Sequence, residues 1–164
     1  EGGGLLINQA IHTLDLLQWF IGEIHSLKGS YSSTLLDDII EVEDTANAVI
    51  RFKNGVNAIF FATNCYVENS PVYIELLLSN GVIRLGSNLT VQYNNGKQET
   101  YCEKNSNTGE KSYWGDSHSR LIQDFYNSIV NSYDFPIDGE QGIIALKMVK
   151  AIYESSDTGS WVEL

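Results

Sequence analysis

The chain has 164 residues, 43% of them apolar and 11% aromatic, which suits one well-cored domain or a piece of a larger protein and argues against disorder. Its 10 basic and 21 acidic side chains give a formal net charge of -11, which argues against nucleic-acid binding because phosphate backbones are repelled. The most apolar run, residues 11–21, is too short and too often interrupted to cross a bilayer, so we expect a soluble protein without membrane contacts.

Three glycines, residues 2–4, precede the first apolar segment. They match neither GxGxxG nor GxxxxGK[ST], and no predicted strand precedes them, so a phosphate-binding loop is not indicated. We interpret them as positions for tight turns or close ligand approach, with a cloning linker as the alternative.

The segment at residues 10–20 is apolar nearly all round, which is typical of a buried helix. Asn8 is its predicted N-cap and Gly22 its predicted C-terminal stop.

One side of this helix carries polar and aromatic residues. His12, Asp15 and Trp19 are three and four residues apart and share a face, with Asn8 one turn before His12. One interpretation is a histidine for proton transfer or for recognition of a substrate hydroxyl. The other is a satisfied core histidine hydrogen-bonded to Asp15.

An acidic segment follows, and it contains Asp37, Asp38, Glu41, Glu43 and Asp44. It lacks the DxDxDG spacing of a calcium loop, so it predicts a solvated loop and no metal site.

Residues 24–102 are rich in Val, Ile, Thr, Tyr and Phe, which favour strands. Asn-Gly pairs at Asn54-Gly55, Asn80-Gly81 and Asn95-Gly96 predict three hairpins in succession, and therefore a largely antiparallel sheet. The strand at residues 57–63 is apolar on both sides of its alternation. We expect its second face to be covered by another subunit in a homo-oligomer.

The remaining segments predict a polar loop at residues 103–115 and helices at residues 117–131 and 140–155, separated by Pro136 and Gly139. Residues 161–164 can add a last strand. The expected fold class is α+β: an open, largely antiparallel sheet with helices packed on one face.

His118 lies in the first turn of the helix at residues 117–131, for which Asp116 or Ser117 is the expected cap. It shares the face of Leu121 and Phe125, and both a structural and a binding role stay open.

Cys65 and Cys102 are far apart and lack metal or disulfide spacing, which favours a reducing, cytoplasmic compartment. The chain begins at Glu1 and its single methionine is Met148. Because translation needs an initiator, we expect an excised piece of a longer protein.

Sequence motifs at both ends of the chain resemble those of one protein family. The segment GGGLLINQAIHTLDLLQWFIG resembles the signature GGGxLxD/NxGxHxxDLxxWxxG that opens the second domain of the glucose-fructose oxidoreductase, inositol dehydrogenase and MocA family. The segments HSRLIQDFYNSI and FPIDGEQGIIALKMVKAIYESSDTGSWVEL resemble the closing helices and last strand of that family. The resemblance covers essentially the whole chain.

This resemblance implies that residues 1–164 are the C-terminal substrate-binding and oligomerisation domain of an NAD(P)-dependent oxidoreductase. Such enzymes transfer a hydride between NAD or NADP and a hydroxyl carbon of a sugar, cyclitol or nucleotide sugar. Their dinucleotide is held by an N-terminal Rossmann domain whose Gly-rich loop and catalytic lysine are absent from this chain. We therefore expect the isolated chain to be inactive and to bind no cofactor tightly.

The resemblance also implies roles for single residues. His12 takes the position of the catalytic histidine, and His118 that of a histidine reaching the substrate pocket. Asn8 stands where an Asp is often found; it cannot relay a proton and would orient the substrate instead. Asp15 is implied to be structural.

Two other classes of function remain as alternatives. The first is a non-catalytic assembly or ligand-binding module with the same fold, which Asn8 favours and His12 with His118 opposes. The second is a metal-dependent hydrolase using His12, Asp15 and the acidic segment, which lacks ligand spacing.

Overall fold

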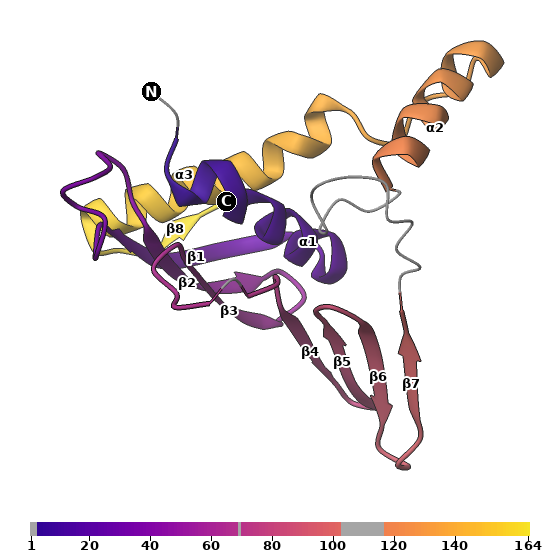
Figure 1. Cartoon of the computed structure of the whole chain (residues 1–164), viewed down its shortest axis with the longest axis horizontal. Helices are drawn as coiled ribbons and strands as arrows, with labels where there is room; N and C mark the ends of the chain where they lie inside the picture. Colours follow the sequence, from indigo (N-terminus) through magenta and orange to yellow (C-terminus); the bar gives the residue numbers. More distant parts are fainter. Residues whose placement is uncertain (1–2, 69, 103–116) are drawn as a thin grey trace. The chain divides into compact units, whose positions relative to one another are not determined.

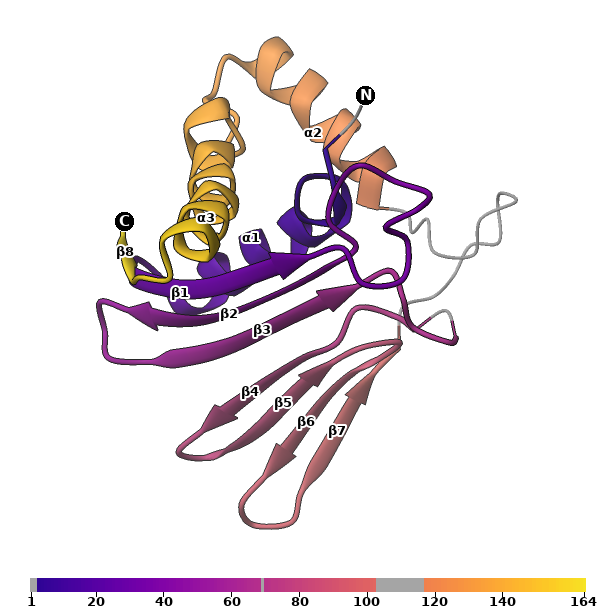
Figure 2. The same cartoon turned by 90° about the vertical axis from the view of Figure 1, so that its left-hand side faces the viewer.

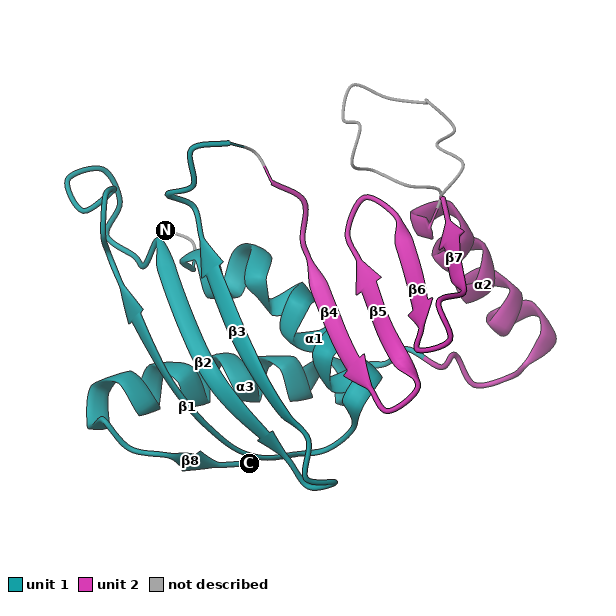
Figure 3. Cartoon of the chain, turned by 90° about the horizontal axis from the view of Figure 1, so that it is seen from below, with its two compact units in different colours: residues 1–69, 137–164 teal, residues 70–136 magenta. Residues whose placement is uncertain are grey.

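The computed structural model describes residues 3–68, 70–102 and 117–164. It divides into two units, Glu1–Asn69 with Ile137–Leu164 and Ser70–Pro136 (Figure 3). Figure 1 shows the elements in chain order. They are η1 (Leu6–Ala10), α1 (Ile11–Ile21), β1 (Ile24–Ser32), β2 (Thr45–Phe52), β3 (Asn57–Thr63), β4 (Ile74–Leu78), β5 (Gly81–Leu85), β6 (Leu89–Tyr93), β7 (Gln98–Tyr101), α2 (Ser117–Asn131), α3 (Gly139–Thr158) and β8 (Val162–Glu163).

The first unit is built on an antiparallel sheet of four strands in the order β3-β2-β1-β8. The β2–β3 hairpin turns at Asn54-Gly55, where Gly55 has a φ of 89°, as the Asn-Gly pair predicts. The predicted last strand is β8, which pairs with β1 at Ser26↔Glu163. Figure 2 shows α1 and α3 over the same face of this sheet. The expected arrangement of helices on one face is confirmed in this unit.

Alternation along β2 places the core on the helical side. Ala46, Ala48, Ile50 and Phe52 are buried, while Asn47, Val49 and Arg51 between them are exposed. From α3, Met148, Val149 and Ile152 are fully buried. Each such large side chain contributes about 1.5–3 kcal/mol on burial, so this layer accounts for much of the stability of the unit.

The helix α3 extends the predicted span by a few residues and has defined ends. Asp138 Oδ1 accepts hydrogen bonds from the N–H groups of Glu140 (3.0 Å) and Gln141 (2.9 Å). At the other end Gly159 adopts a φ of 68°, a left-handed cap. The buried Ser155 Oγ accepts the Gly29 N–H at 3.0 Å, which ties α3 to β1.

The first helix differs from its prediction. A π-helical turn, η1, runs directly into α1, and Ile11 N–H donates to the Leu6 carbonyl five residues back. Asn8 therefore lies inside the helix, and the prediction that it is the N-cap is wrong. The N-terminal donors are taken by a residue distant in sequence, Glu43. The predicted stop is confirmed, since Gly22 N–H closes the helix on Gln18 O at 2.8 Å.

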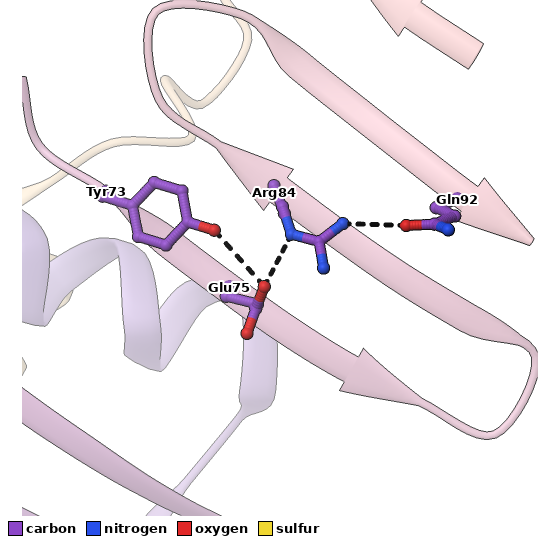
Figure 4. A network of polar contacts seen from close by, with 4 residues as sticks. All are labelled: Tyr73, Glu75, Arg84 and Gln92. Carbon is purple, nitrogen blue, oxygen red and sulfur yellow. Dashed lines mark hydrogen bonds and ion pairs between the residues drawn. The ribbon is translucent and has the colours of Figure 1, made fainter. Parts of the chain in front are cut away.

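The second unit contains a separate antiparallel sheet in the order β4-β5-β6-β7, so the strands form two sheets rather than one. The β4–β5 and β6–β7 hairpins turn at Asn80-Gly81 and Asn95-Gly96, as predicted, whereas the β5–β6 hairpin turns at residues 86–88 without an Asn-Gly pair. Figure 4 shows a polar network across three of its strands. Glu75 Oε2 accepts from Arg84 Nε (2.6 Å) and Tyr73 OH (3.3 Å), and Arg84 Nη1 donates to Gln92 Oε1 (3.1 Å). Glu75 and Arg84 are directly opposite, so this pair supports the strand register.

The helix α2 spans Ser117–Asn131, the predicted range. The predicted loop at residues 103–115 and the candidate cap Asp116 lie outside the described residues. In the ranges that the structure describes, no helix has the length and apolar character needed to span a membrane.

The acidic segment was predicted to be solvated, and this is wrong for two of its residues. Asp37, Asp38 and Glu41 are exposed, but Glu43 is only 6% exposed and Asp44 is fully buried. Asp44 Oδ2 accepts the backbone N–H groups of three successive residues, Thr34, Leu35 and Leu36, at 2.8–3.0 Å. A run of backbone donors can hold a charge that water would otherwise solvate.

Burial by itself raises the pKa of the Asp44 carboxyl, but its hydrogen bonds from the backbone and Thr45 outweigh this and hold the pKa well below its ordinary 3.8. The ionised carboxylate therefore makes its full contribution to stability at pH values well above 3.8. This contribution is lost as the pH falls through the pKa of the native state. We expect Asp44→Ala to lower the Tm by several degrees at pH 7, with the difference from wild type shrinking in acid. Thermal unfolding between pH 7 and pH 2 tests this; the exposed control Asp37→Ala should follow wild type.

Candidate functional site

The first helix is divided lengthwise into a buried and an exposed side. Leu6, Ala10, Leu14 and Leu17 are buried. Asn8, His12, Asp15 and Trp19 are all exposed, so the predicted ridge exists and is open. We call these four residues the helix ridge. The expectation that the helix is buried all round is therefore wrong for this side.

His12 stands at the centre of the helix ridge. Among the described residues it makes no hydrogen bond to Asp15 or to any other side chain, and both residues are exposed. The interpretation as a satisfied core histidine does not hold. Its imidazole nitrogens are free to donate to or accept from an external hydroxyl group.

Asn8 lies one turn before His12, within the π-helical turn. Its Nδ2 donates to the Gly3 carbonyl, and its backbone N–H donates to Gly4 O at 3.0 Å. Among the described residues, no donor approaches Asn8 Oδ1, so this oxygen can accept a hydrogen bond from a ligand. Single π-helical turns are rare and occur often at functional sites.

An aromatic pair closes the C-terminal end of the helix ridge. The Trp19 ring lies 5.1 Å from the Phe20 ring, with their planes at 58°. Trp19 is 72% exposed and Phe20 41%, so the pair presents an apolar surface beside the polar side chains. Such a surface can pack on the apolar face of a ring-shaped ligand.

Glu43 holds the start of this helix, and the sequence analysis missed it. Its carbonyl accepts the Leu5 N–H at 3.1 Å and its Oε1 accepts the Leu6 N–H at 2.9 Å. The Tyr153 hydroxyl of α3 donates to the same Oε1 at 2.8 Å. Burial, and then the Glu43 carboxylate, raise the pKa of Tyr153, so this hydroxyl stays protonated at neutral pH.

A signal for this contact is present in the glycine run. A Cβ at Gly4 would overlap the Glu43 carboxylate. The close approach that the glycines predicted is therefore made, at Gly4, by a side chain of the chain itself and not by a ligand. Nothing in the local sequence names Glu43 as the partner.

His118, the other candidate, is exposed on α2 in the second unit, so its role beside a substrate stays a prediction. His12 and Asn8 are the two candidates that the first unit brings together on one helix.

The described residues do not fit a dinucleotide. Every strand pair among them is antiparallel, and none forms the strand-turn-helix-strand unit that holds a pyrophosphate. Within the same residues no group of three or more His, Cys, Asp or Glu side chains could bind a metal ion. Cys65 and Cys102 are free thiols.

Comparison with known proteins identifies the family. A family model described as "Oxidoreductase family, C-terminal alpha/beta domain" matches residues 1–164. The chain belongs to this family. The family that the end motifs resemble, with glucose-fructose oxidoreductase, inositol dehydrogenase and MocA, is thereby confirmed.

A curated relative matches the whole of this chain. The chain is 26% identical over 182 residues to D-glucoside 3-dehydrogenase of Escherichia coli K12, covering 100% of this chain and 50% of that protein. It therefore spans about half the length of this curated relative.

Solved structures of this family share the fold. The WlbA dehydrogenase of Chromobacterium violaceum, in complex with NADH and UDP-GlcNAcA, superposes with a TM-score of 0.75 at 25% identity, over 99% of this chain and 46% of that one. Myo-inositol 2-dehydrogenase of Lactobacillus plantarum gives a TM-score of 0.76 at 24% identity, over 98% and 48%. The α+β fold class is confirmed.

The two sides of the first helix should respond differently to substitution. We expect His12→Asn to change the free energy of unfolding by less than about 0.5 kcal/mol, because an exposed side chain without partners is removed. Leu14→Ala, two residues away on the buried side, should cost about 2–5 kcal/mol. Denaturant unfolding of both variants tests this. A large decrease in the free energy of unfolding of His12→Asn would indicate that His12 has a structural role.

Proposed function

We propose that the whole protein is an NAD(P)-dependent dehydrogenase that transfers a hydride between the cofactor and a hydroxyl carbon of a sugar, cyclitol or nucleotide sugar. This chain supplies the substrate-facing wall and the subunit interface. The observation that carries the proposal is the exposed helix ridge in a domain of an oxidoreductase family. Among the described residues, the His12 imidazole and Asn8 Oδ1 have no hydrogen-bond partner.

The chain's own part in the reaction concerns the proton and the orientation of the substrate. In the oxidative direction the reacting hydroxyl is hydrogen-bonded to His12, whose neutral imidazole accepts the hydroxyl proton as the carbonyl forms. Asn8 Oδ1 accepts a hydrogen bond from a neighbouring hydroxyl and so fixes the sugar ring. An amide neither gains nor loses a proton here, so of these two residues only His12 has an acid-base role. His118 is proposed as a further substrate contact.

The cofactor belongs to a different part of the protein in this proposal. Because the described strands form no dinucleotide site, NAD or NADP is held by a Rossmann domain outside these residues, and the isolated chain is inactive. The names of the relatives support a sugar, cyclitol or nucleotide-sugar substrate. The free thiols Cys65 and Cys102 suit a reducing compartment, and we place the enzyme in the cytoplasm.

The experiment uses the full-length protein with a panel of sugars, cyclitols and nucleotide sugars, following NAD(P)H formation. We expect His12→Ala to lower kcat by about 10²–10⁴-fold, the usual loss on removing a general base. Asn8→Ala should mainly raise KM, because it removes a substrate contact. Circular dichroism of each variant controls for folding.

Other outcomes have a defined meaning. Unchanged turnover in His12→Ala contradicts its catalytic role. A wild-type protein that turns over no substrate but binds one, seen by calorimetry, favours the non-catalytic ligand-binding module.

We further propose that the outer face of the β3-β2-β1-β8 sheet is covered by a second copy of this chain. Ile59 (86% exposed), Phe61 (66%) and Val49 (44%) lie on the face away from the helices. The Arg51 guanidinium stacks at 3.8 Å over the ring of Trp161 beside them. Two identical apolar sheet faces can bury each other across a two-fold axis.

We expect Phe61→Asp to raise the dissociation constant of the oligomer on the order of tenfold or more, because a charge would be buried in an apolar contact. Sedimentation velocity over a concentration series measures this. The control is Val67→Asp, at a 97% exposed apolar residue outside the sheet, which should leave assembly unchanged. A variant that sediments like wild type at every concentration counts against this interface.

A further inference from the structure

We propose that Glu43 is a positioning residue for the catalytic step: its carboxylate fixes the start of the η1–α1 helix and thereby places His12 and Asn8 against the substrate. This inference rests on the proposed dehydrogenase function. Glu43 itself is buried behind the helix start and has no role in binding substrate.

Glu43 satisfies hydrogen-bond donors at the start of the helix. The first N–H groups of a helix have no partner within the helix. Glu43 accepts two of them, Leu5 N–H at its carbonyl (3.1 Å) and Leu6 N–H at Oε1 (2.9 Å). A carboxylate at this end also interacts favourably with the helix dipole. The helix start is therefore held at two successive residues, which restricts both its rotation and its translation.

Glu43 is itself held by neighbouring side chains. It is only 6% exposed, and Tyr153 OH donates to its Oε1 at 2.8 Å. Tyr153 packs edge-on against Tyr31 at 5.1 Å, and Tyr31 OH donates to Asp157 at 3.1 Å. These contacts come from β1, from the segment that precedes β2 and from α3. They fix the position of the carboxylate relative to the core of the unit.

Gly4 leaves room for the Glu43 carboxylate. A side chain there would collide with the carboxylate, so the backbone before the helix is shaped around Glu43. The same segment carries Gly3 O, the acceptor of Asn8 Nδ2. Two adjacent glycines therefore contact both residues: Gly3 accepts the hydrogen bond that orients Asn8, and Gly4 leaves space for the Glu43 carboxylate.

The consequence for catalysis follows from helix geometry. His12 is six residues after Leu6, about 9 Å along the axis, on a helix that moves as one rigid rod. A shift of about 1 Å in a catalytic group can reduce the rate by about 10²-fold. Releasing the start of the helix should therefore act on kcat without removing any group that contacts substrate.

The test uses the full-length protein and three substitutions. We expect Glu43→Ala and Gly4→Ala to lower kcat by about 10–100-fold, the pattern of a displaced catalytic group. Because Asn8 moves with the helix but is not removed, any rise in KM should be smaller than in Asn8→Ala. Glu43→Gln should retain most of the activity, because its Oε1 can still accept from Leu6 N–H and Tyr153 OH. Activity in Glu43→Gln would show that Glu43 acts by positioning the helix and that its negative charge is not required.

Two matched controls follow from the same structure. Glu41→Ala removes an exposed acidic side chain two residues away and should leave both constants unchanged. Gly142→Ala adds a Cβ where no atom lies within 4 Å, and it controls for the Gly→Ala change itself.

Hydrogen exchange measured by mass spectrometry gives a readout that does not require turnover. We expect faster exchange of the peptide containing residues 5–12 in Glu43→Ala and Gly4→Ala, and wild-type exchange in the controls. Faster exchange with unchanged kcat overturns the positioning role, as does unchanged exchange in both variants. If Glu43→Ala fails to fold, Gly4→Ala and Glu43→Gln carry the test.

A failure of the proposed function is distinguishable from a failure of this inference. If the wild-type protein oxidises no substrate, the dehydrogenase proposal fails. The exchange of residues 5–12 then decides alone whether Glu43 fixes the ridge: faster exchange supports it, and wild-type exchange overturns it.

Discussion

The carboxylate of Glu43 is the constraint on which the first unit depends. A buried charge must be matched by donors, and here the donors come from the helix start at Leu6 and from Tyr153 on α3. Satisfying this one group brings together the segment that leads into β2, the first helix and the last helix. It also removes the need for a local N-cap, which is why a π-helical turn can occupy the position where Asn8 would otherwise cap.

The division of the first helix follows from that anchoring. With its start held, the helix packs Leu6, Leu14 and Leu17 against the core and leaves His12 and Trp19 exposed. A polar ridge of this kind, supported by a buried framework behind it, is the arrangement that catalytic groups need for preorganisation. The helix ridge can act in catalysis only if a ligand binds against it, and we propose that this ligand is the substrate.

The proposed function divides the reaction between this chain and a cofactor-binding domain outside it. An antiparallel sheet with helices on one face offers a wall and an outer surface, but no crossover at which a dinucleotide can bind. The chain spans about half of its relative's length. The apolar outer face with Ile59 and Phe61 lies opposite the helices of the first unit (Figure 2), and it is the face that we propose for assembly.

The sequence by itself determined the features that depend on near neighbours. Asn-Gly turns specified three hairpins, and the three- and four-residue spacing specified the ridge. The stop signals at Pro136 and Gly139 separated α2 from α3, whose ends at Asp138 and Gly159 are made by contacts within a few residues. Tertiary structure decided what depends on distant partners. Glu43 accepts hydrogen bonds from Leu6, 37 positions before it, and from Tyr153, 110 positions after it. No local pattern therefore distinguished it from the exposed Glu41. The burial of Asp44, the exposure of His12 and the separation of the strands into two sheets were likewise set by which surfaces meet in space. Local hydrogen bonding and side-chain spacing are encoded in short windows, whereas desolvation is a property of the assembled core.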